Sequence, residues 1–182
     1  MRDRRRPAMA ERTESIDARD ARRIGLVSDS HGAIDPRIVQ ALGDCDVVVH
    51  AGDIGGPDVL AAFDTTVTVA VYGNNDTRQR WGGVDVALPE SVRIDVRGGS
   101  LAVIHGHQFP RAKQRHAKLR ERYPDAAIVV YGHSHRRCID DATLPWVINP
   151  GACGRARTFG GASAVLLDWR GGQWGVSELT VG

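Results

Sequence analysis

The chain contains little cysteine and no closely spaced cysteine pair. Its three cysteines, Cys45, Cys138 and Cys153, are odd in number and far apart among 182 residues. Disulfide frameworks and structural zinc sites use cysteines in regular pairs, so neither is expected here. We predict three free thiols and a cytoplasmic location.

Long apolar runs and strong net charge are also missing. No apolar stretch reaches the roughly 20 residues of a transmembrane helix. The arginines near the start are followed by polar residues and not by the apolar stretch of a secretory signal. The formal net charge is only +2, so charge gives no indication of a nucleic-acid partner. With 42% hydrophobic and 25% charged residues, the composition is that of an ordinary globular protein.

Residues 1–23 differ in composition from the rest of the chain. They hold eight arginines and five acidic residues, with almost no large apolar side chains. Such a segment buries too little apolar surface to fold by itself, so we predict a disordered extension. An arginine-rich arm that binds an acidic partner is the alternative, which the interspersed acids weaken. Residues 24–182 are predicted to form one domain.

Strand and helix patterns alternate after the extension. Strands are expected first at residues 24–28, 46–50 and 67–72, with helices at 36–42 and 57–63. This order is typical of parallel β-α-β units. A hairpin at 91–105 and a solvent-facing helix at 110–123 follow, and further strands are expected at 126–131, 146–148, 162–169 and 173–181. The predicted fold class is α/β, a mixed β-sandwich of two sheets flanked by helices.

Aspartate, asparagine or histidine follows five of the apolar runs. The motifs are, in order, Asp29-Ser-His31, His50-Ala-Gly-Asp53, Gly73-Asn-Asn-Asp76, His105-Gly-His107 and Gly132-His-Ser-His135. Because ligands bind at the carboxyl ends of parallel strands, we expect these side chains to converge. Carboxylates and neutral imidazoles suit Mn, Fe, Zn, Co or Ni, and the lack of a thiolate argues against a purely structural zinc site. The motifs therefore predict a metal centre at the strand ends.

The ordered motifs, with Asn149-Pro-Gly151 after them, resemble those of the calcineurin-like metallophosphoesterases. They look most like the small single-domain bacterial and archaeal phosphodiesterases related to the retromer scaffold subunit. The resemblance covers Asp29 to Gly151, about two thirds of the chain. It implies the metallophosphoesterase fold and hydrolysis of a phosphodiester by a hydroxide held between two divalent ions. Manganese is the expected metal, with Zn, Fe, Ni or Co as alternatives.

The resemblance also implies a ligand set for each ion. The first ion would be bound by Asp29, His31, Asp53 and His135. The second ion would be bound by Asp53, Asn74, His105 and His133. Asp53 would thus bridge the two ions and belong to the catalytic machinery.

One position departs from the broader family pattern. Asn75 stands where many members have a histidine that protonates the leaving group or contacts the phosphate. We therefore take Asn75 as a catalytic candidate and His107 as the candidate replacement for the missing acid. Arg78 and Arg155 are candidates for binding the substrate phosphate through their planar guanidinium groups. Arg157 is a third such candidate, and a solvated surface position is the alternative for each arginine.

Four other polar residues are predicted to lie outside the ligand set. His50 is expected to be buried behind the ligands, and Asp76 to orient its loop through hydrogen bonds. By resemblance, Asn149 would brace the site from behind. His116, on the polar helix, is expected to be solvated.

Two alternatives to a phosphodiesterase stay open. One is a phosphomonoesterase or nucleotidase, and the other is a non-catalytic scaffold like the retromer relative. All seven ligand positions carry competent side chains, which favours an enzyme. A homo-oligomer is compatible with the sequence but is not indicated by any particular residue.

Overall fold

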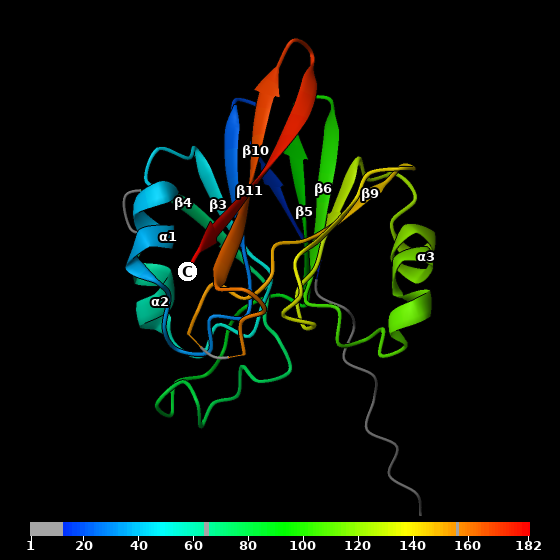
Figure 1. Cartoon of the computed structure of the whole chain (residues 1–182). Helices are drawn as coiled ribbons and strands as arrows, with labels where there is room; N and C mark the ends of the chain where they lie inside the picture. Colours follow the sequence, from blue (N-terminus) through cyan, green and yellow to red (C-terminus); the bar gives the residue numbers. More distant parts are fainter. Residues whose placement is uncertain (1–12, 64–65, 156) are drawn as a thin grey trace, which may run out of the picture.

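The computed structural model describes residues 13–63, 66–155 and 157–182, which form two β-sheets packed face to face. Helices lie on the outer faces, with α1 and α2 on one side of the molecule and α3 on the other (Figure 1). The predicted two-sheet α/β sandwich flanked by helices is confirmed.

The five-stranded sheet has the order β11-β10-β2-β3-β4. Its strands are β2 (Arg23–Val27), β3 (Val47–His50), β4 (Val67–Ala70), β10 (Ala162–Arg170) and β11 (Gln173–Val181). Strands β2, β3 and β4 are parallel, and helices α1 (Pro36–Ala41) and α2 (Pro57–Ala61) connect them as predicted. The carboxyl ends of these three strands consequently lie at one edge of the sheet.

The six-stranded sheet has the order β1-β5-β6-β7-β9-β8. Its strands are β1 (Thr13–Asp17), β5 (Ser91–Val96), β6 (Gly99–Ile104), β7 (Ile128–Val130), β8 (Cys138–Asp140) and β9 (Trp146–Asn149). Strands β6, β7 and β9 are parallel, and helix α3 (Ala112–Arg122) lies between β6 and β7 in the chain. This sheet therefore also brings parallel strand ends together.

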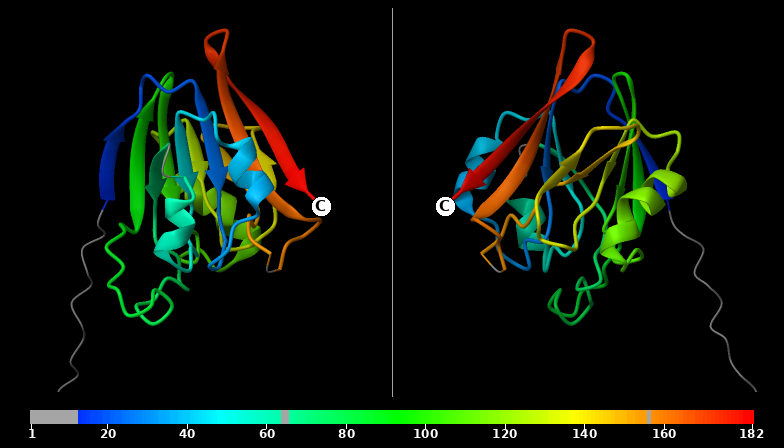
Figure 2. Two further views of the ribbon diagram at one scale, coloured as in Figure 1. Left: turned by 90° about the vertical axis from the view of Figure 1, so that its left-hand side faces the viewer. Right: turned by 45° about the vertical axis from the view of Figure 1, so that its right-hand side comes forward.

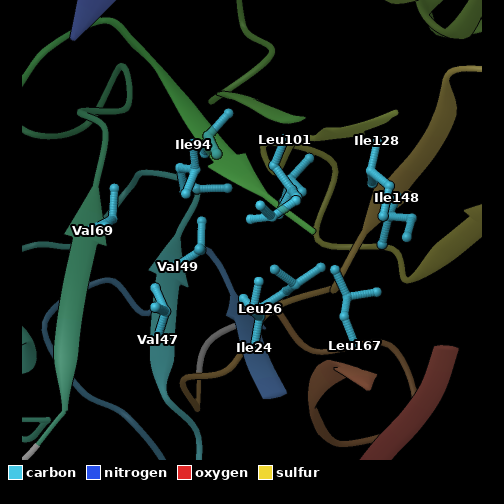
Figure 3. Packing of buried hydrophobic residues seen from close by; sticks show 14 of the residues in the cluster. Ile24, Leu26, Val47, Val49, Val69, Ile94, Leu101, Ile128, Ile148 and Leu167 are labelled. Atoms are coloured by element: carbon cyan, nitrogen blue, oxygen red, sulfur yellow. The ribbon is translucent and has the colours of Figure 1, made fainter. Parts of the chain in front are cut away.

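The main core lies between the two sheets. Side chains of Leu26 and Val49 from one sheet face Leu101 and Ile148 from the other (Figure 3). Each outer face carries a smaller cluster, one including Ile38 of α1 and the other Leu119 of α3. The tip of the β10–β11 hairpin and the loop after β4 lie at opposite ends of the molecule (Figure 2).

The prediction of a disordered extension through residue 23 is wrong for residues 13–17. These residues form β1, which pairs in parallel with β5 from Thr13 opposite Ser91 onward. Ile16 packs against the main core and Ala21 is buried. Composition concealed this strand because a strand at a sheet edge is held mainly by backbone hydrogen bonds and needs few apolar side chains. Residues 18–22 of the predicted extension connect β1 to β2, which begins at Arg23, and residues 1–12 lie outside the described residues.

Two further differences concern local burial and one short strand. The strand β8 carries no strong β pattern and was not predicted. Helix α3 is solvent-facing over most of its length, yet Arg115 and Leu119 are buried on its inner side. Within the described residues, no helix has the length and apolar character required to cross a membrane.

Candidate metal centre

Loops from both sheets meet at the predicted site. The loops after β2 and β3 are joined by backbone hydrogen bonds from Asp29 N to Gly52 O and from His31 N to Asp53 O, each 3.0 Å long. In the other sheet, Gly132 N donates to His105 O across 2.9 Å. The strand ends thus hold the loops against one another before any metal is considered.

The four residues predicted for the first ion lie together. Asp29, His31, Asp53 and His135 each offer a ligand atom, and these atoms lie within 4.8 Å of one another. The Nε2 atoms of His31 and His135 are 3.0 Å apart, and His135 Nε2 is 3.4 Å from Asp29 Oδ1. Burial lowers the pKa of both histidines, so each imidazole is neutral at pH 7 and presents a lone pair. This donor set fits a divalent ion.

Asp29 is a buried carboxyl group with few donors. Ser28 Oγ donates to Asp29 Oδ2 over 2.8 Å, and His133 N donates to Oδ1 over 3.2 Å. Burial raises the pKa of Asp29 to about 7, although His105 and the hydrogen bond from Ser28 oppose the shift. A bound cation would remove this desolvation penalty, which is a second sign that the group fits a metal.

His105 extends the cluster toward the second predicted ion. Its Nε2 lies 3.4 Å from Asp53 Oδ2, is buried, and has no hydrogen-bond partner among the described residues. Its Nδ1 is 2.7 Å from Ala51 O. In the tautomer with the proton on Nδ1, that N–H donates a hydrogen bond to the Ala51 carbonyl. Nε2 then keeps its lone pair for a metal ion. A cation held between this nitrogen and the Asp53 carboxylate would satisfy both groups.

The other two residues predicted for the second ion are placed less closely. The rings of His105 and His133 have centroids 5.3 Å apart, and burial lowers the pKa of His133 to about 4. Asn74 is exposed in the loop after β4. In the described part of the chain its side chain forms no hydrogen bond, so its role as a ligand stays a prediction.

Asn75 belongs to the predicted metal centre because it is hydrogen-bonded to Asp53. Its backbone N donates to Asp53 Oδ1 over 2.8 Å, and its Nδ2 donates to Oδ2 over 2.7 Å. Burial would raise the pKa of Asp53, but His105 and these two hydrogen bonds hold it below its usual value. A carboxylate has about four lone-pair directions, so Asp53 keeps free ones for metal ions.

His107 faces the same region from the loop after β6. Its ring centroid is 5.5 Å from that of His105 and 6.3 Å from that of His133. Its Nδ1 is buried and has no hydrogen-bond partner among the described residues. Burial and the charge of His105 lower the pKa of His107, which favours the neutral imidazole. Its assignment as the replacement acid stays a prediction.

The three arginines predicted to bind phosphate lie in different places. Arg78 Nε donates to Gly83 O over 2.8 Å within its own exposed loop. Arg155 is exposed, and its charge contributes to lowering the pKa of Asp35, which is not a predicted ligand. Arg157 lies at the cluster, with a terminal nitrogen 3.4 Å from His31 Nε2. The contacts therefore favour Arg157 over the other two as the phosphate-binding residue.

Two residues expected to support the ligands do so. His50 is fully buried, and its Nε2 is 2.9 Å from Ser30 Oγ. Asp76 accepts hydrogen bonds from the backbone N–H groups of Ile54, Gly55 and Gly73, at 3.1, 2.8 and 2.8 Å. These contacts fasten the loops after β3 and β4 to each other, so the loop that carries Asp53 has few ways to move.

Asn149 braces the loop that carries His133 and His135. Its Nδ2 donates to Gly132 O over 2.7 Å and to Ser134 Oγ over 3.1 Å, as the resemblance implied. His116 differs from its prediction as a solvated residue. Its ring nitrogens are 2.7 Å from Asp140 Oδ2 and 2.9 Å from the hydroxyl of Tyr131, so it joins α3 to β8 and to the residue after β7. The residue type alone gave no sign of this network.

The backbone at the ligands is unusual. Five of the seven predicted ligands have a positive φ, between 50° and 66°: Asp29, His31, Asp53, His133 and His135. Non-glycine residues rarely adopt this left-handed conformation, although aspartate and histidine tolerate it better than most. Such strain costs about 1–3 kcal/mol per residue and is typical of functional sites. Four of these five residues, Asp29, His31, Asp53 and His135, bring their ligand atoms within 4.8 Å of one another.

Gly73 shows how closely the loops pack. A Cβ atom at this position would lie 2.3 Å from both Asp53 N and Asp53 Oδ1. Only a residue without a side chain lets the loop after β4 approach the central carboxylate this closely. Sequence reasoning missed Ser28, whose only signal is that it immediately precedes Asp29 at the end of a buried strand.

Known proteins resemble this chain in sequence and in fold. Residues 23–172 match the calcineurin-like phosphoesterase superfamily domain. A probable metallophosphoesterase of Methanothermobacter thermautotrophicus is 28% identical over 135 residues, which cover 71% of this chain and 76% of the relative. A phosphodiesterase of Methanocaldococcus jannaschii is 26% identical over 145 residues, covering 72% and 84% of the two chains.

A solved structure supports the fold. Zinc-complexed Vps29 of Entamoeba histolytica has a TM-score of 0.68 at 18% identity and covers 87% of this chain and 98% of its own. The resemblance drawn from the motifs is thus confirmed at the level of the family and the fold. The chain belongs to the calcineurin-like phosphoesterase superfamily.

Proposed function

We propose that this protein is a dinuclear metal-dependent phosphodiesterase. The observation that carries the proposal is the position of Asp53. It belongs to the four-residue cluster whose ligand atoms lie within 4.8 Å of one another, and its Oδ2 is also 3.4 Å from the unpartnered Nε2 of His105. One carboxylate is thus placed to serve two adjacent sets of nitrogen and oxygen donors.

The residues would divide between two divalent ions as the motifs predict. Asp29, His31, Asp53 and His135 would hold one ion, and Asp53, Asn74, His105 and His133 would hold the other. When bound, two such ions neutralise the phosphate charge and make water acidic enough to act as a nucleophile near neutral pH. Manganese is our preferred metal, with Zn, Fe, Ni and Co as alternatives for a nitrogen and oxygen donor set.

The protein's own groups orient the substrate and the ligands. Asn75 holds both oxygens of Asp53, and the Ala51 carbonyl fixes the His105 ring. Arg157, whose guanidinium lies beside His31, is placed to bind a non-bridging phosphate oxygen. His107, whose ring centroid is 5.5 Å from that of His105 and 6.3 Å from that of His133, is our candidate for protonating the leaving group.

A diester is the proposed substrate class, and the M. jannaschii relative named as a phosphodiesterase supports it. A second class of function, a scaffold that binds partner proteins, is supported by the fold similarity to Vps29. The complete set of ligand types and the five strained ligand positions favour catalysis over this alternative.

The three described cysteines are free, which agrees with a reducing compartment. The cytoplasmic location and the formation of a homo-oligomer stay predictions.

The decisive experiment measures hydrolysis of bis-p-nitrophenyl phosphate by chelator-stripped protein reloaded with Mn²⁺. This diester has a good leaving group, so turnover does not depend on a strong general acid. We expect metal-dependent turnover, lower rates with p-nitrophenyl phosphate, and loss of turnover in Asp53→Asn. Binding of two ions per chain without turnover would contradict the enzyme and favour the scaffold. Faster hydrolysis of the monoester would replace the phosphodiesterase with a phosphomonoesterase.

A further inference from the structure

A cavity opens directly beside the metal-ligand cluster. Its volume is about 380 Å³, and it is lined by His133, Ser134, His135, Arg157, Thr158 and Phe159. Two of the lining residues are predicted metal ligands, and the others belong to the ligand loop or to the segment that follows Asn149-Pro-Gly151. The size lies within the range of small-molecule sites. A substrate whose phosphate meets the ions would therefore extend into this space.

Phe159 gives the cavity an aromatic wall. The residue is 58% exposed, although phenylalanine is among the residues most often buried. The guanidinium carbon of Arg136 lies 4.3 Å from the centre of its ring, within the distance for a cation–π contact. Arg136 directly follows His135, so the ring is held by the same loop that carries two of the ligands. An exposed ring supported in this way is preorganised to stack on a flat group.

Arg157 connects this aromatic wall to the reaction centre. Its guanidinium lies 3.4 Å from His31 Nε2, and its backbone has a φ of +55°. The cavity thus has the positive charge of Arg157 next to the ligand cluster and the exposed ring of Phe159 further along its wall. A phosphate ester with a planar group a short distance from its phosphorus would satisfy both features at once.

We propose that Phe159, supported by Arg136, is a stacking subsite that selects phosphate esters carrying a planar aromatic group such as a nucleobase. This inference rests on the proposed function, because it places the phosphate at the metal centre. Bases stack on aromatic side chains through their π faces with little sequence preference, so the subsite favours a base over a sugar without choosing among bases.

The test compares binding of adenosine 5′-monophosphate and ribose 5-phosphate to the Mn²⁺-loaded full-length protein. The two ligands share the sugar and the phosphate and differ in the base. We expect adenosine 5′-monophosphate to bind about ten-fold more tightly than ribose 5-phosphate, because stacking of one base on an aromatic ring strengthens binding by about that factor. Phe159→Leu should remove this preference, Phe159→Trp should keep it, and Arg136→Gln should reduce it. Leu144→Ala is the matched control, because Leu144 is also exposed, at 73%, but lies outside this cavity.

Equal affinity of the wild-type protein for the two ligands, or a preference that persists in Phe159→Leu, would overturn the subsite. Circular dichroism and Mn²⁺ affinity of each variant show whether a loss comes from misfolding, and Phe159→Trp then serves as the second test of the ring. Turnover of bis-p-nitrophenyl phosphate by the wild type is measured separately. Turnover without a base preference would reject only the subsite, whereas base preference without turnover would reject only the proposed catalysis.

Discussion

Asn75 donates hydrogen bonds to both carboxylate oxygens of Asp53, one from its backbone and one from its side chain. Asn75 stands where the resemblance implies a histidine in many family members, and these two contacts give it a structural task of its own. It orients the carboxylate that both proposed ligand sets would share.

Asn75→Ala is expected to weaken metal binding by about ten-fold, at the lower end of what supporting hydrogen bonds to ligands contribute. Only the side-chain bond to Asp53 Oδ2 is lost, because the backbone bond remains. Titration of the metal-stripped protein with Mn²⁺ measures the effect. Thr77→Ala, in the same loop, is the control, and equal Mn²⁺ affinity of Asn75→Ala and the wild type would show that the side-chain bond does not position Asp53.

Gly73→Ala is expected to disrupt the centre more severely. The added Cβ would lie 2.3 Å from the backbone and side chain of Asp53, so one of the two loops must shift. We expect at least a ten-fold loss of Mn²⁺ affinity and a lower thermal unfolding midpoint. Gly175→Ala provides the matched control, because a Cβ there meets nothing closer than 3.7 Å. Similar behaviour of the two variants would mean that the loops are less tightly packed than described.

Arginine variants distinguish the three candidates for phosphate binding. Arg157→Ala should raise the KM for bis-p-nitrophenyl phosphate several-fold, because a charge-assisted contact with the phosphate is lost. Arg78→Ala and Arg155→Ala should change KM less than two-fold, since neither side chain contacts the ligand cluster among the described residues. Steady-state kinetics at saturating Mn²⁺ provides the comparison. A larger effect at Arg155 than at Arg157 would restore the first prediction made from the sequence.

Asp140 should give the fold a measurable dependence on pH. Hydrogen bonds from Arg120, and then from His116, lower the pKa of Asp140 to about 2. Because the folded pKa lies below the unfolded value of about 3.9, the stabilisation is fully present above that value. It is lost as the pH falls toward 2. Urea unfolding of wild type and Asp140→Asn should therefore differ more at pH 6 than at pH 3, and a difference independent of pH would show that the carboxylate charge is not involved.

The sequence carried most of the fold because its strongest signals were local. Buried strands such as β2 and β3 are short apolar runs with clear ends, and the proline at the start of α1 marks the helix. The strand β1 was missed because it has only one large apolar residue, Ile16, and depends on β5 for its hydrogen bonds. Pairing between residues so far apart leaves no local pattern.

The site could be predicted as a set of residue types but not as a network. Asp29, His31, Asp53 and His135 stood out because each follows an apolar run, and the structure places their ligand atoms within 4.8 Å of one another. Arg157 and His31 are in contact although they lie 126 residues apart in the sequence, so no local pattern could predict this contact. The role of His116 likewise depends on Tyr131 and Asp140, which come close only through packing of α3 on the sheet.

The edge position of β1 sets a limit on how the protein can be shortened. Among the strands of the described residues, β1 is the outermost of its sheet and pairs there with β5 alone. A version of the protein that starts at residue 24 would leave the hydrogen-bonding groups of β5 uncovered, and an exposed strand edge recruits other chains. Trimming the arginine-rich start for crystallisation or expression should therefore stop before Thr13, since a shorter form would gain a surface prone to aggregation.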